Sequence, residues 1–254
     1  MARQKGLIKL KGTMGDITFY RTKDGYMARE KGGITAERMR NDPAFQRTRE
    51  NMAEFGRAGK AGKVLRNSFQ SLLRTSGDRL MVSRLTREMV KVIQLDATNA
   101  RGLRNVIDGE AELLQGFDFN IHGKLNTSFN GRFVSTLDRV TGNAHIDIDP
   151  FVPKDNVIAP AGSTHYNLVS AAADINFEAE TYTSAKTESG ILPIDNMLTL
   201  PMPLHNELPA DSKNPLFLLF GISFYQDVNG TFYELKNGSY NALQIVQVSG
   251  TPTP

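Results

Sequence analysis

Residues 216–248 have the sequence LFLLFGISFYQDVNGTFYELKNGSYNALQIVQV. Two Asn-Gly dipeptides, at 229–230 and 237–238, divide this stretch into three strand-like runs. Asn-Gly favours the two-residue turns of β-hairpins because both positions of such turns require positive φ angles. The stretch therefore predicts a meander of three antiparallel strands, over 216–226, 231–236 and 239–248.

The same pattern extends over the rest of the C-terminal half. Asn130-Gly131 is a third hairpin dipeptide, and Thr141-Gly142-Asn143 joins strand-like runs at 132–140 and 144–149. Several strands between such turns, with almost no helical periodicity, are typical of an antiparallel β-sandwich. We predict an immunoglobulin-like β-sandwich domain over residues 116–254.

Residues 172–183 alternate between apolar and polar side chains, with Ile175 and Phe177 on one face. The alternation predicts a single strand whose other face carries three carboxylates, those of Asp174, Glu178 and Glu180. At about 3.3 Å per residue, such a face extends over about 20 Å. We expect it to bind the basic helices of a second copy of the chain.

A basic helical region is predicted over residues 35–115. Asp42 and Pro43 are typical of an N-cap and a first helical position, and a helical pattern then runs to about Arg74. Its apolar stripe consists of Phe55, Ala58, Ala61, Gly62, Leu65, Phe69, Leu72 and Leu73. The basic residues that we assign to self-association on this helix are Arg57, Lys60, Lys63 and Arg66.

Three glycines, at 56, 59 and 62, lie within this helical pattern. Each costs about 1 kcal/mol relative to alanine in a helix. They either divide the helix into two or let another backbone approach closely. A second amphipathic helix is predicted over 83–96, and a short third one near 110–115.

The first 34 residues predict a β-arm. Strand-like runs occupy 7–10, 17–21 and 26–29, and Asp24-Gly25 marks a hairpin between the last two. Three such short strands bury little apolar surface, so the arm must dock on its own chain or on a neighbour. We assign its aromatic residues Phe19, Tyr20 and Tyr26 to self-association.

Charge is divided unequally along the chain. Residues 1–110 hold 23 Lys and Arg against 12 Asp and Glu, a net charge of +11, whereas residues 111–254 hold 7 against 15, a net of −8. The two parts together give the +3 of the whole chain. Opposite charge on two parts of one chain attracts a second copy as readily as a foreign partner.

Composition places the protein among soluble α+β proteins. The 254 residues include no cysteine, which excludes disulfides, thiolate metal sites and thiol catalysis. The N-terminus has no apolar stretch of signal-peptide length, and the longest apolar run, 216–224, is too short to cross a bilayer. We expect a protein that is cytoplasmic as synthesised, does not bind membranes, and is able to leave the cell within a particle or filament.

Motifs of catalysis are absent from the sequence. It contains no His-Glu-x-x-His, no Walker loop, no dinucleotide fingerprint and no Gly-x-Ser-x-Gly. His145, Asp147 and Asp149 alternate along one strand face, a pattern that is ordinary for a half-exposed strand and too sparse for a metal site. We therefore predict neither an enzyme nor a cofactor, a metal or a small-molecule substrate.

Two functions are favoured over a third, a carbohydrate-binding or adhesive sandwich, for which the chain has no tryptophan and few aromatic residues. An active site assembled from scattered residues would leave no motif in the sequence. The first of the two favoured functions is a structural protein that assembles with other copies of itself into a filament or particle, through its arm and its oppositely charged surfaces. The alternative is a nucleic-acid-associated accessory protein, because the basic helical face is able to neutralise several phosphates. That helical face carries no interleaved aromatic residue for stacking on bases.

The N-terminal third also carries a resemblance. KGTMGDITFYRTKDGYMAREKGG at 11–33, NDPAFQRTREN at 41–51 and EFGRA at 54–58 resemble the opening of an uncharacterised family of bacterial proteins. The order of a Gly-rich turn, an aromatic strand, an Arg-containing strand and a helix is also similar to proteins of phage-like and mobile elements. The resemblance covers about the first 110 residues and implies a structural or assembly role, with no catalytic residues to assign.

Overall fold

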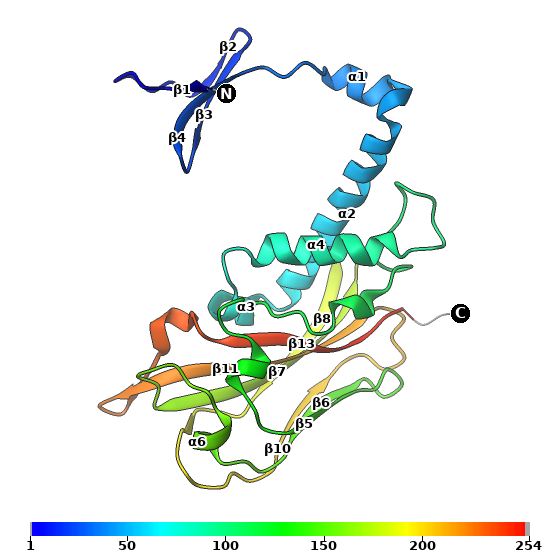
Figure 1. Ribbon diagram of the computed structural model, residues 1–254. Coiled ribbons are helices and arrows are strands. Elements are labelled where there is room, and N and C mark those ends of the chain that lie inside the picture. Colours follow the sequence, from blue (N-terminus) through cyan, green and yellow to red (C-terminus); the bar gives the residue numbers. More distant parts are fainter. Residues whose placement is uncertain (1, 252–254) are drawn as a thin grey trace. The chain divides into compact units, whose positions relative to one another are not determined.

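The computed structural model describes residues 2–251, and its compact parts divide between Arg49 and Glu50. We call residues 2–49 the N-terminal unit and residues 50–251 the body. Both units combine helices with antiparallel strands, so the predicted α+β class is confirmed (Figure 1). The division differs from the predicted boundaries at 34 and 115, because the helices after Glu50 share a core with the following strands.

The N-terminal unit begins with a four-stranded antiparallel sheet, which we call the arm sheet. Its strands are β1 (Ala2–Arg3), β2 (Gly12–Met14), β3 (Ile17–Thr22) and β4 (Gly25–Glu30), in the order β1-β4-β3-β2. The predicted hairpin forms between β3 and β4, whose register places Thr22 opposite Gly25. The prediction of a strand at 7–10 is wrong, since this segment pairs with no strand and β2 begins later.

Two short helices complete the N-terminal unit. Helix α1 (Ala36–Asn41) begins at the N-cap Thr35, whose hydroxyl accepts the Arg38 amide. The Asp42 carboxylate then accepts the Ala44 amide at 2.9 Å and begins the 3₁₀ turn η1 (Pro43–Phe45). The predicted capping residue is therefore confirmed, although the 3₁₀ turn precedes the long helix.

The body's helices are α2 (Gln46–Ser68), whose first residues belong to the N-terminal unit, α3 (Gln70–Ser76) and α4 (Met81–Gln94), with the 3₁₀ turn η2 (Ala111–Leu114). Helix α2 continues through all three glycines and ends at Ser68, which excludes one of the two alternatives, a division of the helix at the glycines. Phe55 was also predicted to be inward, yet it is 62% exposed. Its neighbour Glu54 is buried instead, because its carboxylate accepts the Gly102 amide at 2.8 Å.

A six-stranded antiparallel sheet forms the centre of the body. Its strands are β7 (His165–Asn176), β8 (Thr181–Glu188), β9 (Leu192–Pro193), β11 (Leu216–Val228), β12 (Thr231–Glu234) and β13 (Ala242–Ser249). The β11–β12 hairpin forms at Asn229-Gly230, both with positive φ as predicted. The second predicted hairpin is wrong: residues 235–238 form the turn η3 (Leu235–Gly238), in which Lys236, Asn237 and Gly238 have positive φ, and β13 then pairs with β11 rather than β12.

A smaller antiparallel sheet has the order β10-β6-β5, with β5 (Phe133–Leu137), β6 (Asn143–Ile148) and β10 (Met202–Glu207). The predicted turn at Thr141-Gly142 joins β5 to β6, and Gly142 has φ 79°. Asn130-Gly131 does not form the predicted hairpin, because the residues before it lie in the short helix α5 (Leu125–Ser128) and Phe129 bridges to Val157. A further short helix, α6 (Pro153–Asn156), follows β6.

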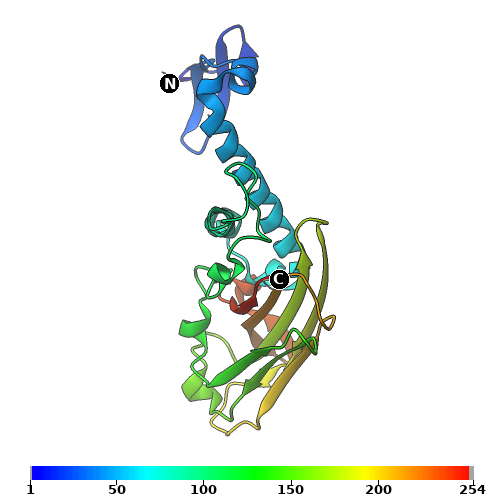
Figure 2. The ribbon, with the colours of Figure 1, turned by 90° about the vertical axis from the view of Figure 1, so that its right-hand side faces the viewer.

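Two hydrophobic cores lie on opposite faces of the six-stranded sheet. On one face, Ala173, Phe217 and Ile245 pack with apolar residues of α2 and α4. On the other, Leu168, Leu218 and Phe220 pack with Ile146 and Leu204 of the smaller sheet. Within the body, the strands therefore lie between the helices on one side and a second sheet on the other (Figure 2).

Arg139 joins the two sheets at one end. Its guanidinium donates to the carbonyls of Ser212 and Asn214 at 2.7 Å, and to those of Ser249 at 2.9 Å and Gly250 at 2.5 Å. Burial lowers the pKa of Arg139, while the charges of Asp174 and Glu112 raise it. The β5–β6 turn is thereby tied to the end of β13.

Candidate self-association surfaces

The arm sheet buries none of its own side chains. Every residue of β1 to β4 is exposed or half-buried, including Phe19, Tyr20 and Tyr26. Phe19 lies opposite Ala28 and Tyr26 opposite Arg21, so both aromatic rings are on one face, whereas Tyr20 is on the other. Each face thus has aromatic surface that the sheet itself does not cover.

Arginines lie over two of these rings. The Arg21 guanidinium is 5.6 Å from the centre of the Tyr26 ring, and that of Arg29 is 5.4 Å from the Tyr20 ring. Such cation–π pairs contribute about 0.5–1 kcal/mol each at exposed sites. They organise the sheet without requiring a buried core.

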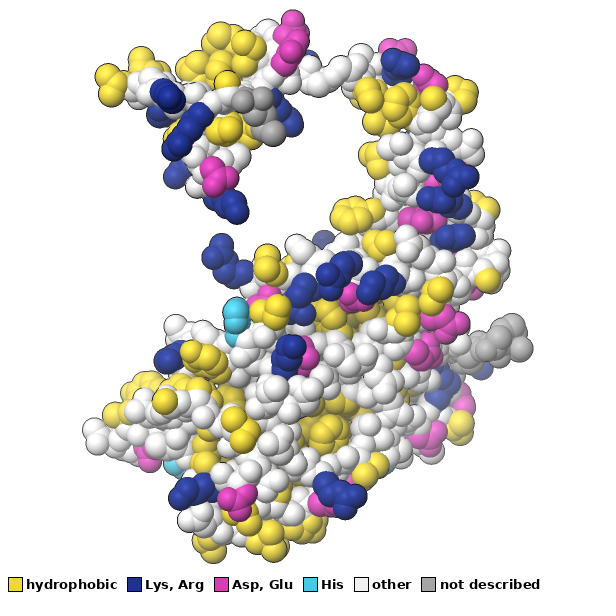
Figure 3. Space-filling view, in the orientation of Figure 1, with side chains coloured by type: hydrophobic (Ala, Val, Ile, Leu, Met, Phe, Trp, Pro, Cys, Tyr) yellow, Lys and Arg dark blue, Asp and Glu magenta, His cyan; other side chains and the backbone are white. Residues whose placement is uncertain are grey.

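Aliphatic side chains add to this surface. Leu7 is fully exposed and Ile8 is 82% exposed, and Met14 and Ile17 are also exposed. Figure 3 shows hydrophobic side chains beside Lys and Arg over the arm sheet. Several exposed apolar side chains in one small unit mark a contact site more often than an isolated exposed leucine does.

The acidic residues that we assigned to a strand lie around the β7–β8 hairpin instead. β7 ends at Asn176, whose side chain accepts the amides of Glu178 and Ala179, and β8 begins at Thr181. The prediction of one strand over 172–183 is therefore wrong. The turn was missed because the polar alternation of the sequence continues through its four residues, which include neither glycine nor proline. Within this turn Glu180 has φ 56°.

The three carboxylates have different environments. Asp174 is only 5% exposed and accepts the Asn214 side-chain amide at 2.7 Å. Glu178 and Glu180 are exposed in the turn. They do not form the continuous 20 Å acidic strand face that the alternation predicted.

The basic residues of α2 are partly engaged within the same body. Arg57 donates to the carbonyls of Gly102 and Arg104, and Arg66 donates to that of Gly62. Lys60 Nζ lies 3.9 Å from Glu180 Oε1, across a cavity of about 480 Å³ between α2 and the β7–β8 hairpin. Lys63 is exposed. Part of the predicted attraction between helix and hairpin therefore occurs within one chain.

One strand edge of the body has no partner. β8 is the last strand on its side of the six-stranded sheet and pairs only with β7. Within residues 2–251, its main chain bonds only to β7, while on the face that Thr187 shares with Thr183 the strand contacts β10, where the Thr187 hydroxyl donates to the His205 carbonyl at 2.5 Å. Residues 181–184 are exposed, and no sequence signal distinguished this strand from a paired one.

A cavity of about 340 Å³ adjoins this edge. It is lined by Asp174, Asn176, Thr181, Tyr182, Thr183, Pro209, Ser212, Lys213 and Asn214. Asp174 and Thr183 are opposite each other in the β7–β8 register, so both lie on the sheet face turned away from the helices. The cavity thus combines a carboxylate with an open strand edge.

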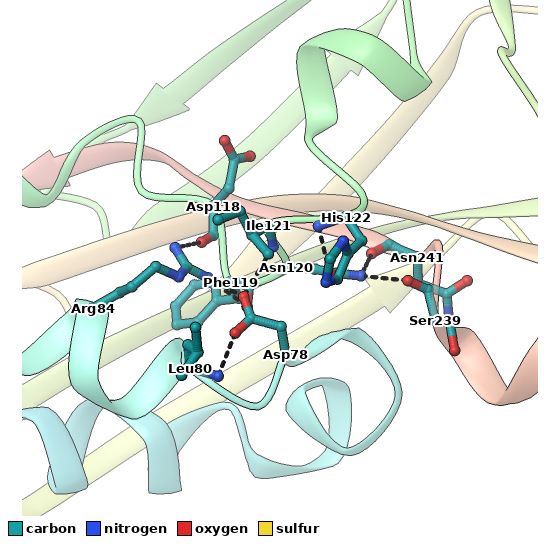
Figure 4. Close-up of polar contacts among 10 residues, drawn as sticks. All are labelled: Asp78, Leu80, Arg84, Asp118, Phe119, Asn120, Ile121, His122, Ser239 and Asn241. Atoms are coloured by element: carbon teal, nitrogen blue, oxygen red, sulfur yellow. Dashed lines mark hydrogen bonds and ion pairs between the residues drawn. The ribbon is translucent and has the colours of Figure 1, made fainter. Parts of the chain in front are cut away.

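A polar network of the body surrounds Asp78 and Arg84 (Figure 4). The Asp78 carboxylate accepts the amides of Leu80 at 2.6 Å and Ile121 at 2.9 Å, and it pairs with the Arg84 guanidinium. Arg84 also donates to the Asp118 carbonyl at 2.7 Å and the Phe119 carbonyl at 3.1 Å. The network ties the beginning of α4 to the segment 118–121.

Asn120 continues this connection to the sheet. Its side chain donates to the carbonyls of Ser239 at 3.0 Å and Asn241 at 2.8 Å, and it accepts the His122 amide at 3.0 Å. A cavity of about 520 Å³ adjoins these residues. Because the carboxylate and the amide are both engaged with the backbone, we assign the network a structural role.

Burial affects the two aspartates of this region differently. Burial alone would raise the pKa of Asp78, but hydrogen bonds from the Ile121 amide, Arg84 and the Leu80 amide bring it below its usual value. For Asp118, burial raises the pKa more than its hydrogen bonds from Leu125 and Gln244 lower it. The Asp78 carboxylate therefore remains charged in the folded protein at neutral pH.

The histidine strand face shows one local pair. His145 Nε2 lies 3.3 Å from Asp147 Oδ2, and His145 is opposite His205 in the β6–β10 register. Within residues 2–251, no group of three or more His, Asp or Glu side chains has an arrangement able to hold a metal ion.

Comparison with family models, with curated proteins and with solved structures gave no match. The resemblance to bacterial and phage-like proteins therefore stays a prediction. In the described part of the chain, no helix has the length and apolar character needed to cross a membrane.

Proposed function

We propose that this protein is a non-enzymatic structural protein that self-associates through its arm, as a subunit of a filament or particle. One observation carries the proposal. The arm sheet has no buried residue, its residues Met14 and Ile17 are exposed, and so are Leu7 and Ile8 in the segment between β1 and β2. An isolated sheet of this size gains little stability from its own packing, so its apolar surface needs a partner.

Charge supports the same proposal. Residues 1–49 hold 12 Lys and Arg against 5 Asp and Glu, whereas residues 111–254 have a net charge of −8. Contact between unlike surfaces of identical copies is head-to-tail, and such contacts generate open filaments or closed rings. Long-range attraction between these surfaces favours encounter at low ionic strength.

The interpretation of the C-terminal part as an immunoglobulin-like sandwich belongs to this proposal. Its support is the apolar core shared by two antiparallel sheets. The helices packed on the outer face of the larger sheet are a departure from a simple sandwich.

Deletion of residues 1–33 tests the proposed function. Both body cores consist of residues 58–248, so we expect the shortened protein to keep the far-ultraviolet circular dichroism of a folded body. Light scattering after gel filtration and negative-stain microscopy should then show oligomers or filaments for the full chain and monomers for the deletion variant. A folded deletion variant that forms the same assemblies would contradict the arm's role.

The alternative, a nucleic-acid-associated accessory protein, depends on the basic face of α2. Arg57 and Arg66 bind backbone carbonyls and Lys60 lies near Glu180, which leaves Lys63 as the exposed cation of the four without a described contact. Gel-shift titration at physiological salt tests this alternative. Binding that disappears on charge reversal of these four residues would favour it over self-assembly.

A further inference from the structure

A strand-like segment without a partner and a strand edge without a partner occur in the same chain. The segment is Leu7–Lys11, in the N-terminal unit, and the edge is that of β8, in the body. The inference drawn from them rests on the proposed self-association and specifies the two surfaces that meet.

The segment Leu7–Lys11 has the sequence LIKLK, which alternates like a strand. The main-chain groups of Leu7, Ile8 and Lys9 make no hydrogen bond within residues 2–251. At Leu10, the Gln4 side chain substitutes for a strand partner: its amide oxygen accepts the Leu10 N–H at 2.9 Å, and its amide nitrogen donates to the Leu10 carbonyl at 3.2 Å. In the single chain Leu7 and Ile8 lie in a bend, so the segment has to extend in order to pair, and its main-chain groups at 7–9 are free to do so.

The β8 edge offers the complementary groups. Its first five residues, Thr181–Ala185, are uncharged and contain no proline. Exposed edge strands of native proteins usually carry charges, prolines or bulges that prevent pairing with another chain. Five residues extend about 16 Å, the length of the five-residue segment in the arm.

We propose that Leu7–Lys11 of one copy adds to the β8 edge of the next copy as an extra strand. Main-chain hydrogen bonds supply the affinity in this mode of recognition, and alternate side chains supply the specificity. Release of the two exposed Gln4 hydrogen bonds frees Leu10 for the new pairing.

The alternation assigns each side chain of the segment to one face. Tyr182 and Ser184 lie opposite Ile175 and Ala173, which belong to the core beneath the helices. Ile8 and Leu10 go to this face, where Tyr182 is exposed. Leu7, Lys9 and Lys11 go to the other face, and the two lysines there lie beside the cavity that contains the Asp174 carboxylate.

Charge favours the β8 edge. Residues 1–33 hold 8 Lys and Arg against 3 Asp and Glu. Glu178 and Glu180 lie in the turn that leads into β8, and Asp174 lines the adjoining cavity. The other long edge of the body is less open, because β5 contacts β13 and the turn that follows β5 is tied to the end of β13 by Arg139.

Cysteine pairs test the proposal, since the natural chain contains no cysteine. One full-length variant carries Ile8→Cys or Leu10→Cys, and a second, enlarged by a tag, carries Ser184→Cys. After mixing and oxidation, we expect a disulfide between the two chains for at least one pairing, detected on a non-reducing gel and located by mass spectrometry. Cross-strand neighbours on one face are close enough for a disulfide, whereas residues on opposite faces are not.

Two matched controls define the site. Lys9→Cys with Ser184→Cys places the thiols on opposite faces and should give no disulfide. In the second control, the cysteine of the body is Phe232→Cys in place of Ser184→Cys. Phe232 lies on β12, the exposed strand at the far edge of the same sheet, and this cysteine should form no disulfide with Ile8→Cys or Leu10→Cys. A same-chain variant, Ile8→Cys with Ser184→Cys, should give disulfide-linked dimers and larger species on the non-reducing gel.

Charge at the edge gives a second readout that does not need oxidation. Thr183 is exposed on the face assigned to Lys9 and Lys11, so Thr183→Lys should weaken association about tenfold or more through repulsion from these lysines, whereas Thr183→Glu should not weaken it. Equal loss with both variants would overturn a charge-complementary edge.

The outcomes separate this inference from the proposed function. Disulfides to Phe232→Cys, or only within one chain, would overturn the β8 assignment. Absence of any disulfide would also overturn the β8 assignment. The proposed function would remain intact in that case if deletion of residues 1–33 still converts oligomers into monomers. A full-length chain that is monomeric at high concentration would overturn both.

Discussion

Replacing Asp78 by asparagine perturbs the network that joins α4 to the segment 118–121. The carboxylate accepts three hydrogen bonds, from the Leu80 amide, the Ile121 amide and Arg84. The Asp78 side chain is 5% exposed and that of Arg84 is 19% exposed, so water replaces little of what is lost. Asparagine has the same size, but its side-chain NH₂ group then faces one of these three donors, and the negative charge opposite Arg84 is lost.

The magnitude follows from these contacts. A buried donor left without its acceptor costs about 1–3 kcal/mol, and the hydrogen bond from Arg84 loses about 1 kcal/mol when its acceptor becomes neutral. We therefore expect Asp78→Asn to lower the free energy of unfolding by about 3 kcal/mol at neutral pH. Asp155→Asn, an exposed substitution with the same chemistry, should cause no measurable change.

The pH dependence gives the prediction a second signature. The folded-state pKa of Asp78 is below the unfolded value of about 3.9. The contribution of the carboxylate is therefore complete above the unfolded pKa and is lost as the pH falls through the folded pKa. The difference between wild type and Asp78→Asn should be full at neutral pH and should shrink below about pH 4.

Urea unfolding of the full chain, followed by circular dichroism at one protein concentration, measures both quantities. The reasoning would be refuted by an Asp78→Asn protein as stable as wild type at neutral pH. A loss of stability that stays constant into the acid range would refute the electrostatic part.

Three further substitutions test other parts of the body. Arg139→Lys keeps the charge but loses the forked guanidinium that donates to the carbonyls around the β5–β6 turn. Calorimetry should show a free energy of unfolding lower by about 2 kcal/mol, and an unchanged melting temperature would contradict this expectation. Tyr166→Phe removes a buried hydroxyl that has no hydrogen-bond partner among the described residues and whose pKa is raised by burial to about 12. The variant should be as stable as wild type or more stable in thermal unfolding, and a clear loss of stability would contradict the absence of a partner. Gly142→Ala places a Cβ 2.1 Å from the Leu208 carbonyl oxygen at φ 79° and should cost about 2 kcal/mol or more in urea unfolding, whereas Gly190→Ala, at the same φ with open space around it, should cost less.

Local signals in the sequence predicted the parts of the fold that local chemistry determines. Asn229-Gly230 forms its hairpin because both residues adopt positive φ, and Asp42 caps the turn before α2. Residues 81–94 form a helix close to the predicted range, because their apolar positions repeat at helical spacing.

Long-range contacts explain the failures. Phe55 is exposed because the adjacent Glu54 turns inward to the Gly102 amide, a partner 48 positions away that no local pattern indicates. The β7–β8 turn has no glycine or proline, so the alternation hides it. Asn237 and Gly238 also adopt positive φ but join no hairpin, because β13 pairs with the other end of β11 and not with β12.

The candidate surfaces were predictable only in part. The sequence indicates an arm with too little surface to bury, and Phe19, Tyr20 and Tyr26 do lie in its sheet. It does not indicate that Leu7 and Ile8 are left unpaired, or that β8 is an edge strand, because both properties depend on which strands become neighbours.

The association constant of a serine double variant tests the central claim most directly. Leu7→Ser with Ile8→Ser removes the two most exposed aliphatic side chains of the arm, each of which contributes about 2 kcal/mol when buried in a contact. Sedimentation across a concentration series should therefore show association weakened by about 10²–10³-fold. Leu198→Ser with Leu200→Ser, an equally apolar exposed pair in the body, should leave association unchanged. Equal association of wild type and the arm variant would contradict the account.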